Sequence, residues 1–212
     1  MANDLQTRAA MCEVGRWLWQ RNLIGAIEGN MVVRIGKNEL LCTPAGKNKG
    51  MLNPDDLLVV DMNGVPKSGG KPSSEIKLHL EVFAQRNDCI ASIHAHPPYA
   101  TVLATIGETI PDNILPEAAI VLGSVALVPF AMPGTEETRN VIRPFLEFHK
   151  TFLLSNHGAL ALGKDIYDAF ARIETLERVA TVLHLANVAD APTPLSSEAF
   201  EYLLENALNA RL

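Results

Sequence analysis

The stretch Cys89-Ile90-Ala91-Ser92-Ile93-His94-Ala95-His96-Pro97-Pro98 joins an apolar run to two histidines. Its apolar part, residues 89–93, predicts a buried strand. Because residues two apart on a strand point to the same face, the imidazoles of His94 and His96 can reach one ion. The stretch therefore predicts both an interior strand and a pair of metal ligands at its end.

A second apolar run, residues 151–154, leads into Asn156-His157-Gly158. Two strand ends that each deliver imidazole to one place can supply the three nitrogens of a catalytic zinc site with an open position. The alternative is that these histidines are polar residues at strand ends that hydrogen-bond to loops, which is the commoner role of a single histidine. When the segment around Glu75 is also considered, a metal site becomes the favoured interpretation of the three histidines taken together.

Short strand-like runs alternate with helical patterns along the rest of the chain. Gly36-Lys37-Asn38 predicts a hairpin, and Asn63-Gly64 predicts a tight turn. The order of elements predicts an α/β or α+β arrangement of layers with a mixed or mainly antiparallel sheet. The predicted strands are 31–35, 40–43, 57–61, 89–93, 125–130 and 151–154, with 160–162 continuing or pairing with the last. The predicted helices are 4–23, one opening at Glu75, 98–106, 136–148 with a kink at Pro144, 166–188, and 196–208 capped by Ser196 or Ser197.

The composition is typical of a soluble globular protein, with 48% hydrophobic and 20% charged residues. A length of 212 residues makes one large domain the default. The net charge of −6 argues against a surface built to neutralise nucleic-acid phosphates. Three scattered cysteines favour a reducing compartment, and no apolar stretch is long enough to span a bilayer. We therefore expect a cytoplasmic protein without a nucleic-acid or membrane partner.

A second candidate site element is Pro72-Ser73-Ser74-Glu75, directly before a helical pattern. Two serines at a helix N-terminus present hydroxyl and N–H groups that favour an anion, although ordinary N-capping accounts for the serines taken alone. Two loop clusters, Gly29-Asn30 and Thr43-Pro44-Ala45-Gly46, are likewise explained by turn chemistry when each is taken alone. The clusters become specific only as an ordered set.

As an ordered set over about residues 5–190, these motifs make the chain resemble the class II aldolase/adducin family, which includes L-fuculose-phosphate aldolase. The motifs are Gly29-Asn30, Thr43-Pro44-Ala45-Gly46, Pro72-Ser73-Ser74-Glu75, His94-Ala95-His96 and Asn156-His157-Gly158. The resemblance implies a three-layer α/β/α sandwich around a central mixed, mainly antiparallel sheet, with residues 1–212 as one domain. It also implies a homotetramer with active sites at subunit interfaces.

The resemblance further assigns roles to single residues. By match to the family motif, His94, His96 and His157 would be zinc ligands, and Glu75 would ligate the metal and then act as the acid/base catalyst. Another divalent ion such as Co²⁺ or Mn²⁺ stays an alternative, because three imidazoles also bind these ions. The residues implied to bind the substrate phosphate are Gly29, Asn30, Thr43, Gly46, Ser73 and Ser74.

Three positions near these motifs raise questions. Glu28 stands where the family often has serine or glycine, beside the expected phosphate. Leu115 aligns with the family's catalytic tyrosine from the adjacent subunit, so the nearby Glu117 becomes a candidate proton carrier in the neighbour's site, and equally a capping or interface carboxylate. His79, four residues after Glu75, either orients that carboxylate or serves as packing, and packing is the favoured interpretation.

The activity that the resemblance implies is reversible cleavage of a phosphorylated ketose of the fuculose-1-phosphate type. The products would be dihydroxyacetone phosphate and an aldehyde, formed through a metal-stabilised enediolate. An epimerase, a dehydratase or a decarboxylase of a sugar phosphate is an alternative, because each uses the same metal site to stabilise a carbonyl-derived anion. A non-catalytic adducin-like module is a further alternative, against which the three histidines and Glu75 count.

Overall fold

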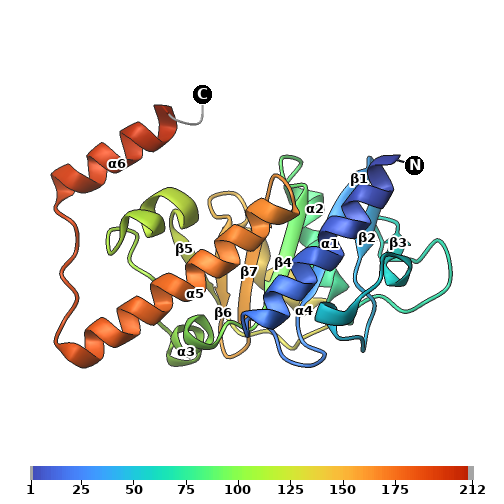
Figure 1. Ribbon diagram of the computed structural model, residues 1–212, viewed down its shortest axis with the longest axis horizontal. Coiled ribbons are helices and arrows are strands. Elements are labelled where there is room, and N and C mark those ends of the chain that lie inside the picture. The colour runs from blue at the N-terminus through green and yellow to red at the C-terminus, as the bar shows by residue number, and fades with distance from the viewer. Residues whose placement is uncertain (1, 210–212) are drawn as a thin grey trace.

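A seven-stranded sheet forms the centre of the computed structural model, which describes residues 2–209 (Figure 1). The strands follow the order β3-β2-β1-β4-β7-β6-β5, and neighbours are antiparallel except for β5 with β6. The strands are β1 Asn30–Gly36, β2 Glu39–Cys42, β3 Leu58–Val60, β4 Ala91–Ala95, β5 Val125–Val128, β6 Thr151–Leu154 and β7 Gly158–Gly163. The predicted mixed, mainly antiparallel sheet is confirmed.

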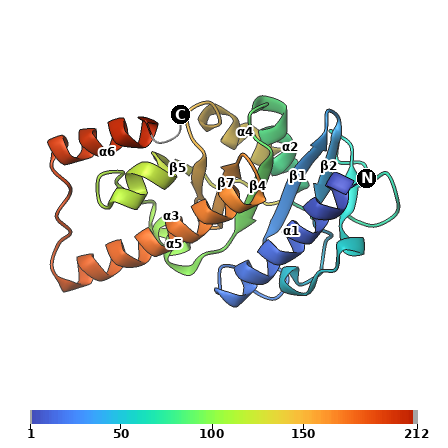
Figure 2. The same cartoon turned by 45° about the horizontal axis from the view of Figure 1, so that its top comes forward.

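Helices cover both faces of this sheet, which confirms the predicted three layers (Figures 1 and 2). One layer contains α1 Ala2–Gln20, α3 Pro98–Ile106 and α5 Ile166–Ala189, and the other contains α2 Ile76–Gln85 and α4 Glu137–Ile142. The last helix, α6 Ser197–Asn209, follows a long connection after α5 and stands out from the layers. Among the described residues, no helix combines the length and apolar character needed to cross a membrane.

Alternation along the strands decides which side chains face which helical layer. Met31 and Val33 of β1 pack with the α1 and α5 side, whereas Val32 packs with the α2 and α4 side. On β4, Ile93 belongs to the α5 side, so its neighbours Ser92 and His94 point toward α2. The polar residues of the site therefore emerge on the α2 face of the sheet.

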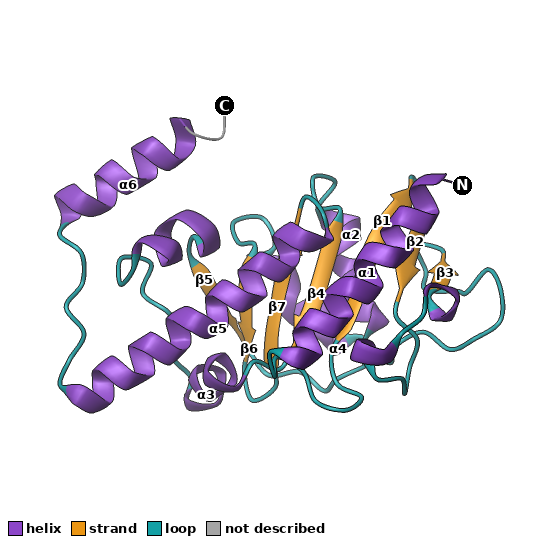
Figure 3. Cartoon of the chain, viewed as in Figure 1, coloured by secondary structure: helices purple, strands orange, loops and turns teal. Residues whose placement is uncertain are grey.

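The boundaries of several elements differ from the prediction for local reasons, and Figure 3 shows which parts of the chain are helix, strand and loop. Helix 136–148 does not simply kink at Pro144: α4 ends at Ile142 and a 3-10 helix, η4 Arg143–Phe145, follows, because proline lacks the N–H that an α-helix needs. Glu75 is the residue before α2 rather than part of its first turn. The remaining short helices, none of them predicted, are the 3-10 helices η1 Lys49–Met51 and η2 Pro54–Asp56 and the π-helix η3 Ala118–Leu122.

A buried carboxylate joins α2 to the segment of α4 and η4. Glu81 is 1% exposed and accepts hydrogen bonds from Arg139 Nε at 2.9 Å and Arg143 Nε at 2.5 Å. Burial raises the pKa of Glu81, but the hydrogen bonds from Arg143 and Arg139 outweigh it and lower the pKa to about 2. The carboxylate is therefore charged throughout the neutral range and stabilises the contact between the two helices.

We expect Glu81→Gln to lower the free energy of unfolding by about 2 kcal/mol, the typical contribution of hydrogen bonds to a charged group. Because the folded-state pKa lies below the ordinary 4.5, this contribution is present above about pH 4.5 and is lost as the pH falls through about 2. Urea unfolding of both proteins across this range measures the difference. Glu147→Gln, at an exposed position, is the control, and a wild-type-to-variant difference that does not change with pH would contradict the prediction.

Candidate metal centre

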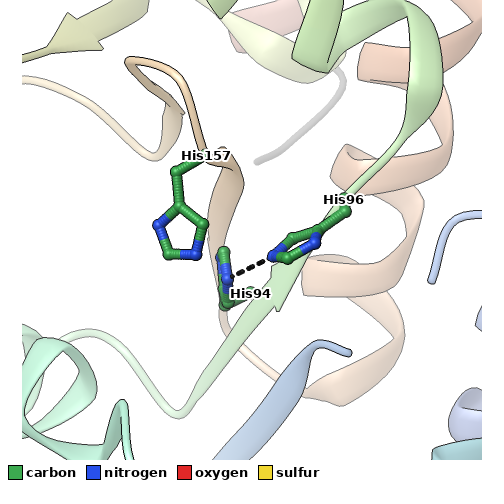
Figure 4. Close-up of side chains that lie close together, drawn as sticks. All are labelled: His94, His96 and His157. Atoms are coloured by element: carbon green, nitrogen blue, oxygen red, sulfur yellow. Dashed lines mark hydrogen bonds between the residues drawn. The ribbon is translucent and has the colours of Figure 1, made fainter. Parts of the chain in front are cut away.

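The three predicted histidines come together at one end of the sheet, as Figure 4 shows. His94 is the second-last residue of β4, His96 directly follows the strand, and His157 lies in the turn between β6 and β7. One nitrogen from each imidazole lies within 4.8 Å of the others. The Nε2 atoms of His94 and His96 are 3.0 Å apart. The two strand ends therefore deliver imidazole nitrogens to a single place, as their spacing predicts.

The turn that carries His157 is shaped by its two neighbours. Asn156 has φ +55, a left-handed conformation that asparagine adopts more readily than most residues. Gly158 lies against the β4 end, where a Cβ atom would come within 2.5 Å of the Ala95 carbonyl oxygen and 2.7 Å of His96 Cδ2. A glycine is therefore needed for the two histidine-bearing segments to approach this closely.

Contacts of Nδ1 in His94 and His96 leave the Nε2 atoms of both rings facing the cluster. His94 is fully buried, and its Nδ1–H donates to the Ala159 carbonyl oxygen at 2.9 Å. This bond assigns a proton to Nδ1, so Nε2 is the nitrogen that faces the cluster and would bind a metal ion, as in metal-bound histidines. The Nδ1 atom of His96 lies 3.5 Å from Glu28 Oε2. Burial, together with the nearby His94 and His157, lowers the pKa of His96 to about 4, so its imidazole is neutral at pH 7.

Glu75 completes the cluster from the start of α2. Its Oε2 is 3.3 Å from His94 Nε2, and its Oε1 is 3.1 Å from His157 Nε2. Burial raises the pKa of Glu75, but His94 and His157 outweigh it and hold the pKa far below its ordinary value. Glu75 is therefore a carboxylate that faces two imidazoles.

The donor set fits a divalent metal ion. Zinc binds imidazole nitrogen at about 2.0–2.1 Å in tetrahedral geometry, which separates neighbouring nitrogens by about 3.3 Å. The 3.0 Å between the Nε2 atoms of His94 and His96 is close to that separation. Imidazole nitrogen and carboxylate oxygen are also the ligand types that zinc and its neighbours in the first transition row accept.

The loop residues assigned to phosphate lie beside this cluster. The N–H of Ser73 donates to the Thr43 carbonyl oxygen at 3.3 Å, so the two loops run side by side, and Gly46 has φ +70 with open space around it. Thr43 is fully buried, and its hydroxyl accepts the N–H of Met31 at 3.1 Å. Within this set, Gly46 and the partly or fully exposed Ser73 and Ser74 offer the accessible groups, whereas Thr43 supports the loop from beneath.

Asn30 links the start of β1 to the cluster of histidines and Glu75. It pairs with His94 in the β1–β4 register and is 3% exposed. Its Nδ2 donates to Glu75 Oε2 at 2.9 Å. The preceding Gly29 has φ +67, and a Cβ there would lie 2.9 Å from the His94 carbonyl oxygen. The Gly29-Asn30 pair is therefore built against the β4 end, where a side chain at position 29 would not fit.

Two charged residues of the site were not assigned from the sequence. Glu28 turns toward His96, accepts the Gly25 N–H at 2.7 Å, and lines a hollow of about 380 Å³ with His96, His157 and residues of α3. Lys49 is 2% exposed and donates from Nζ to the carbonyl oxygens of Ile27 at 2.8 Å and Lys47 at 2.9 Å. Lys49 thereby ties the loop before Asn30 to the loop after Thr43. No local sequence signal marks a lysine in Lys47-Asn48-Lys49 as buried.

Glu117 lies away from this cluster in the same chain. It precedes η3, which leads into the start of β5, whereas His157 follows the end of β6. Because β5 and β6 are parallel, the two positions are at opposite ends of the sheet. Glu117 is exposed at the surface. A role in catalysis would therefore require the site of a second subunit, as the sequence hypothesis assumes.

Comparisons with known proteins identify relatives over most of the chain. Residues 9–184 match the family model of the class II aldolase and adducin N-terminal domain. The chain is 32% identical over 181 residues to a 3-oxo-tetronate 4-phosphate decarboxylase of Haemophilus influenzae, covering 84% of this chain and 86% of that protein. It is 34% identical over 172 residues to an L-fuculose phosphate aldolase of Methanococcus maripaludis, covering 80% and 92%. The solved structure of an L-fuculose 1-phosphate aldolase matches with a TM-score of 0.86 and 31% identity, covering 95% of each chain.

Proposed function

Because the chain belongs to the class II aldolase and adducin family, we propose that it is a zinc-dependent lyase that reversibly cleaves a phosphorylated ketose to dihydroxyacetone phosphate and an aldehyde. The observation that carries the proposal is the convergence of three imidazoles at one place, two of which contact the carboxylate of Glu75. A non-catalytic module has no need for that cluster. Relatives named as fuculose-phosphate aldolases support the choice of reaction.

His94, His96 and His157 would hold the ion, with Glu75 as a further ligand. When bound, the ion supplies the Lewis acidity that stabilises the negative charge left on the three-carbon fragment by cleavage of the C3–C4 bond. Glu75 is ionised and partly buried beside the imidazoles, with a side chain that is 14% exposed, so it accepts and returns the proton at the fragment's reacting carbon. The Glu75 carboxylate lies beside His94 and His157, two of the residues that would hold the ion. The proton would therefore be transferred close to the negative charge on the three-carbon fragment.

Phosphate binding supplies the remote contacts that orient the substrate. Gly46, Ser73 and Ser74 form the accessible rim, and the buried Thr43 and Lys49 hold their loops together. Backbone N–H and hydroxyl donors of such loops suit a dianion. Binding energy from the phosphate fixes the reacting carbons relative to Glu75, so it contributes to the rate as well as to the affinity.

The second candidate reaction is decarboxylation of a phosphorylated 3-oxo acid, which the decarboxylase relatives support. In this reaction too, the ion would stabilise the negative charge left on the substrate and Glu75 would transfer the proton. A decarboxylase must, however, accept a substrate carboxylate, and Glu28 adds a negative charge to the hollow beside His96 and His157. The other walls of that hollow include the apolar residues Pro98, Val102 and Ile106. An uncharged aldehyde end suits this hollow better than a carboxylate does, which favours aldol cleavage.

A product assay with zinc-reconstituted protein tests the choice. Phosphorylated ketoses and phosphorylated 3-oxo acids are supplied in parallel, and dihydroxyacetone phosphate, carbon dioxide and water-loss products are identified. The proposal predicts dihydroxyacetone phosphate from at least one ketose. Carbon dioxide release from the oxo acids without any ketose cleavage would replace the aldolase assignment with the decarboxylase.

We also propose a homotetramer in which Glu117 enters a neighbouring site as a proton carrier, in place of the family tyrosine. Glu117→Gln is then expected to lower kcat by about 10²-fold, the lower end of the usual contribution of a positioned acid or base. The measurement is turnover of the substrate identified above, with the oligomeric state checked by light scattering. Glu108→Gln, at another exposed position, is the control, and an unchanged kcat in an intact oligomer would exclude Glu117 from the reaction.

A further inference from the structure

A line of buried polar side chains runs from the middle of β4 to Glu75. Ser92 Oγ lies 2.8 Å from His79 Nδ1, and His79 Nε2 contacts Asn30 Oδ1. Asn30 Nδ2 then donates to Glu75 Oε2 at 2.9 Å. Ser92 and His79 are fully buried, and Asn30 is 3% exposed. His79, interpreted from the sequence as packing, therefore occupies a defined place in a hydrogen-bonded chain that ends on the proposed catalytic carboxylate.

The donor and acceptor atoms of Ser92, His79, Asn30 and Glu75 allow only one direction of hydrogen-bond donation along this line of side chains. A carboxylate only accepts, so the Asn30 amide must present Nδ2 to Glu75 and Oδ1 to His79. The reversed amide would set Oδ1 against the carboxylate, with no hydrogen between two acceptors. Since Oδ1 only accepts, His79 must donate from Nε2, and its Nδ1 must accept the hydroxyl hydrogen of Ser92. The tautomer of His79 thus fixes the orientation of the Asn30 amide.

Glu75 has a particular need for such a support. Within the described part of the chain, the hydrogen-bond and ion-pair contacts of its carboxylate are with His94, His157 and Asn30. The two imidazoles would direct Nε2 at a metal ion, so among these three side chains Asn30 is the hydrogen-bond donor that orients the carboxylate. Asn30 is itself held by His79, a fully buried side chain of α2 that also contacts Ser92 of β4.

We propose that His79 is a positioning residue, which through Asn30 fixes the orientation of the Glu75 carboxylate beside the metal centre. The inference rests on the proposed function for the role of Glu75, but the hydrogen-bond direction is independent of the substrate. Without His79, Glu75 would keep its place before α2, but its side chain would be less restricted in orientation. The expected consequence is slower proton transfer with little change in substrate affinity, because phosphate contacts from Gly46 and Ser73 stay in place.

The tautomer of His79 is measurable without any substrate. A long-range ¹H–¹⁵N correlation spectrum of the zinc-loaded protein shows which ring nitrogen carries the proton. The proposed chain requires a neutral His79 with hydrogen on Nε2 and a hydrogen-bonded, unprotonated Nδ1. Hydrogen on Nδ1 would overturn the proposal, because Asn30 would then present its Nδ2 to His79 and its oxygen to Glu75. This result stands whether or not a ketose is the substrate.

The variant test compares His79→Leu with Phe83→Leu, which exchanges another buried ring of α2 for the same aliphatic side chain one turn later. We expect His79→Leu to lower kcat by about 10- to 100-fold, as typical for a residue that supports a metal-site group, with less than about a threefold change in KM. The cobalt-loaded form should retain one ion per chain with a shifted visible absorption spectrum. Phe83→Leu should keep the parent kcat and spectrum.

His79→Gln provides the conservative rescue, because its amide can donate to Asn30 and accept from Ser92. We expect it to restore the parent cobalt spectrum and most of kcat, and it replaces His79→Leu if the latter does not fold. Equal losses in His79→Leu and Phe83→Leu would overturn the proposal in favour of packing. If no ketose is cleaved by the parent protein, the proposed function fails, while the tautomer and the cobalt spectra still decide the role of His79.

Discussion

The His94→Ala variant is expected to lose its bound metal ion and at least about 10³-fold in kcat/KM. His94 is fully buried, its Nδ1 donates to the Ala159 carbonyl oxygen, and alanine offers no nitrogen in place of Nε2. A Lewis-acid ion contributes several kcal/mol of charge stabilisation, and each 1.36 kcal/mol corresponds to a factor of about ten in rate. Elemental analysis after dialysis, together with turnover, measures both losses.

His184→Ala is the matched control for this substitution, because His184 is an exposed histidine of α5 outside the cluster. The control should retain one ion per chain and the parent kcat/KM. If the His94→Ala protein kept both its metal ion and its turnover, His94 would be a structural histidine. The alternative drawn from the sequence, a polar residue at a strand end, would then be correct.

The Glu75→Gln variant is expected to keep its metal ion and to lose about 10²- to 10⁴-fold in kcat, the usual contribution of a positioned acid or base. Glutamine has almost the same shape as glutamate, and its amide oxygen still accepts from Asn30 Nδ2. Its amide cannot accept and release a proton as a carboxylate does, however. His94, His96 and His157 remain to hold the ion. Metal content and single-turnover rates at saturating substrate separate binding from chemistry.

An exposed carboxylate gives the comparison for Glu75. Glu136→Gln changes a surface residue with a side chain that is 64% exposed, and turnover should not change. A Glu75→Gln protein within a few-fold of the parent kcat would exclude Glu75 as the proton carrier. Loss of the ion in the same variant would instead make Glu75 an essential ligand, whose removal empties the site that the three imidazoles are proposed to fill.

The order of strands and helices follows from the sequence where apolar periodicity is strong. The run 89–93 identified β4, and the hairpin 31–35 with 40–43 appears as β1 and β2. The three histidines were found because strand geometry places residues two apart on one face. Prediction was weaker where a single residue changes the backbone: Pro144 ends α4 instead of bending it, and residues 118–122 form a π-helix that their uniform apolar run does not indicate.

Contacts between distant segments were the part of the site that the sequence could not supply. The amide of Asn30 matched a phosphate motif, yet the bond from its Nδ2 to Glu75 depends on the β1–β4 register and on the start of α2. Lys49 resembles a solvated charge until the fold buries its ammonium between two loops. His79 lies four residues after Glu75, but its hydrogen-bond partners are on the sheet, at Ser92 of β4 and Asn30 of β1. Tertiary packing decides each of these contacts.

X-ray absorption at the zinc edge of the reconstituted, dialysed protein tests the three-imidazole centre most directly. The expected spectrum corresponds to one zinc per chain, surrounded by nitrogen and oxygen at about 2.0–2.2 Å. Its multiple-scattering features should indicate three imidazoles in the parent protein and fewer in His96→Ala. Failure to retain zinc, or a sulfur shell at about 2.3 Å from the free cysteines Cys12, Cys42 or Cys89, would contradict a metal site built from His94, His96 and His157.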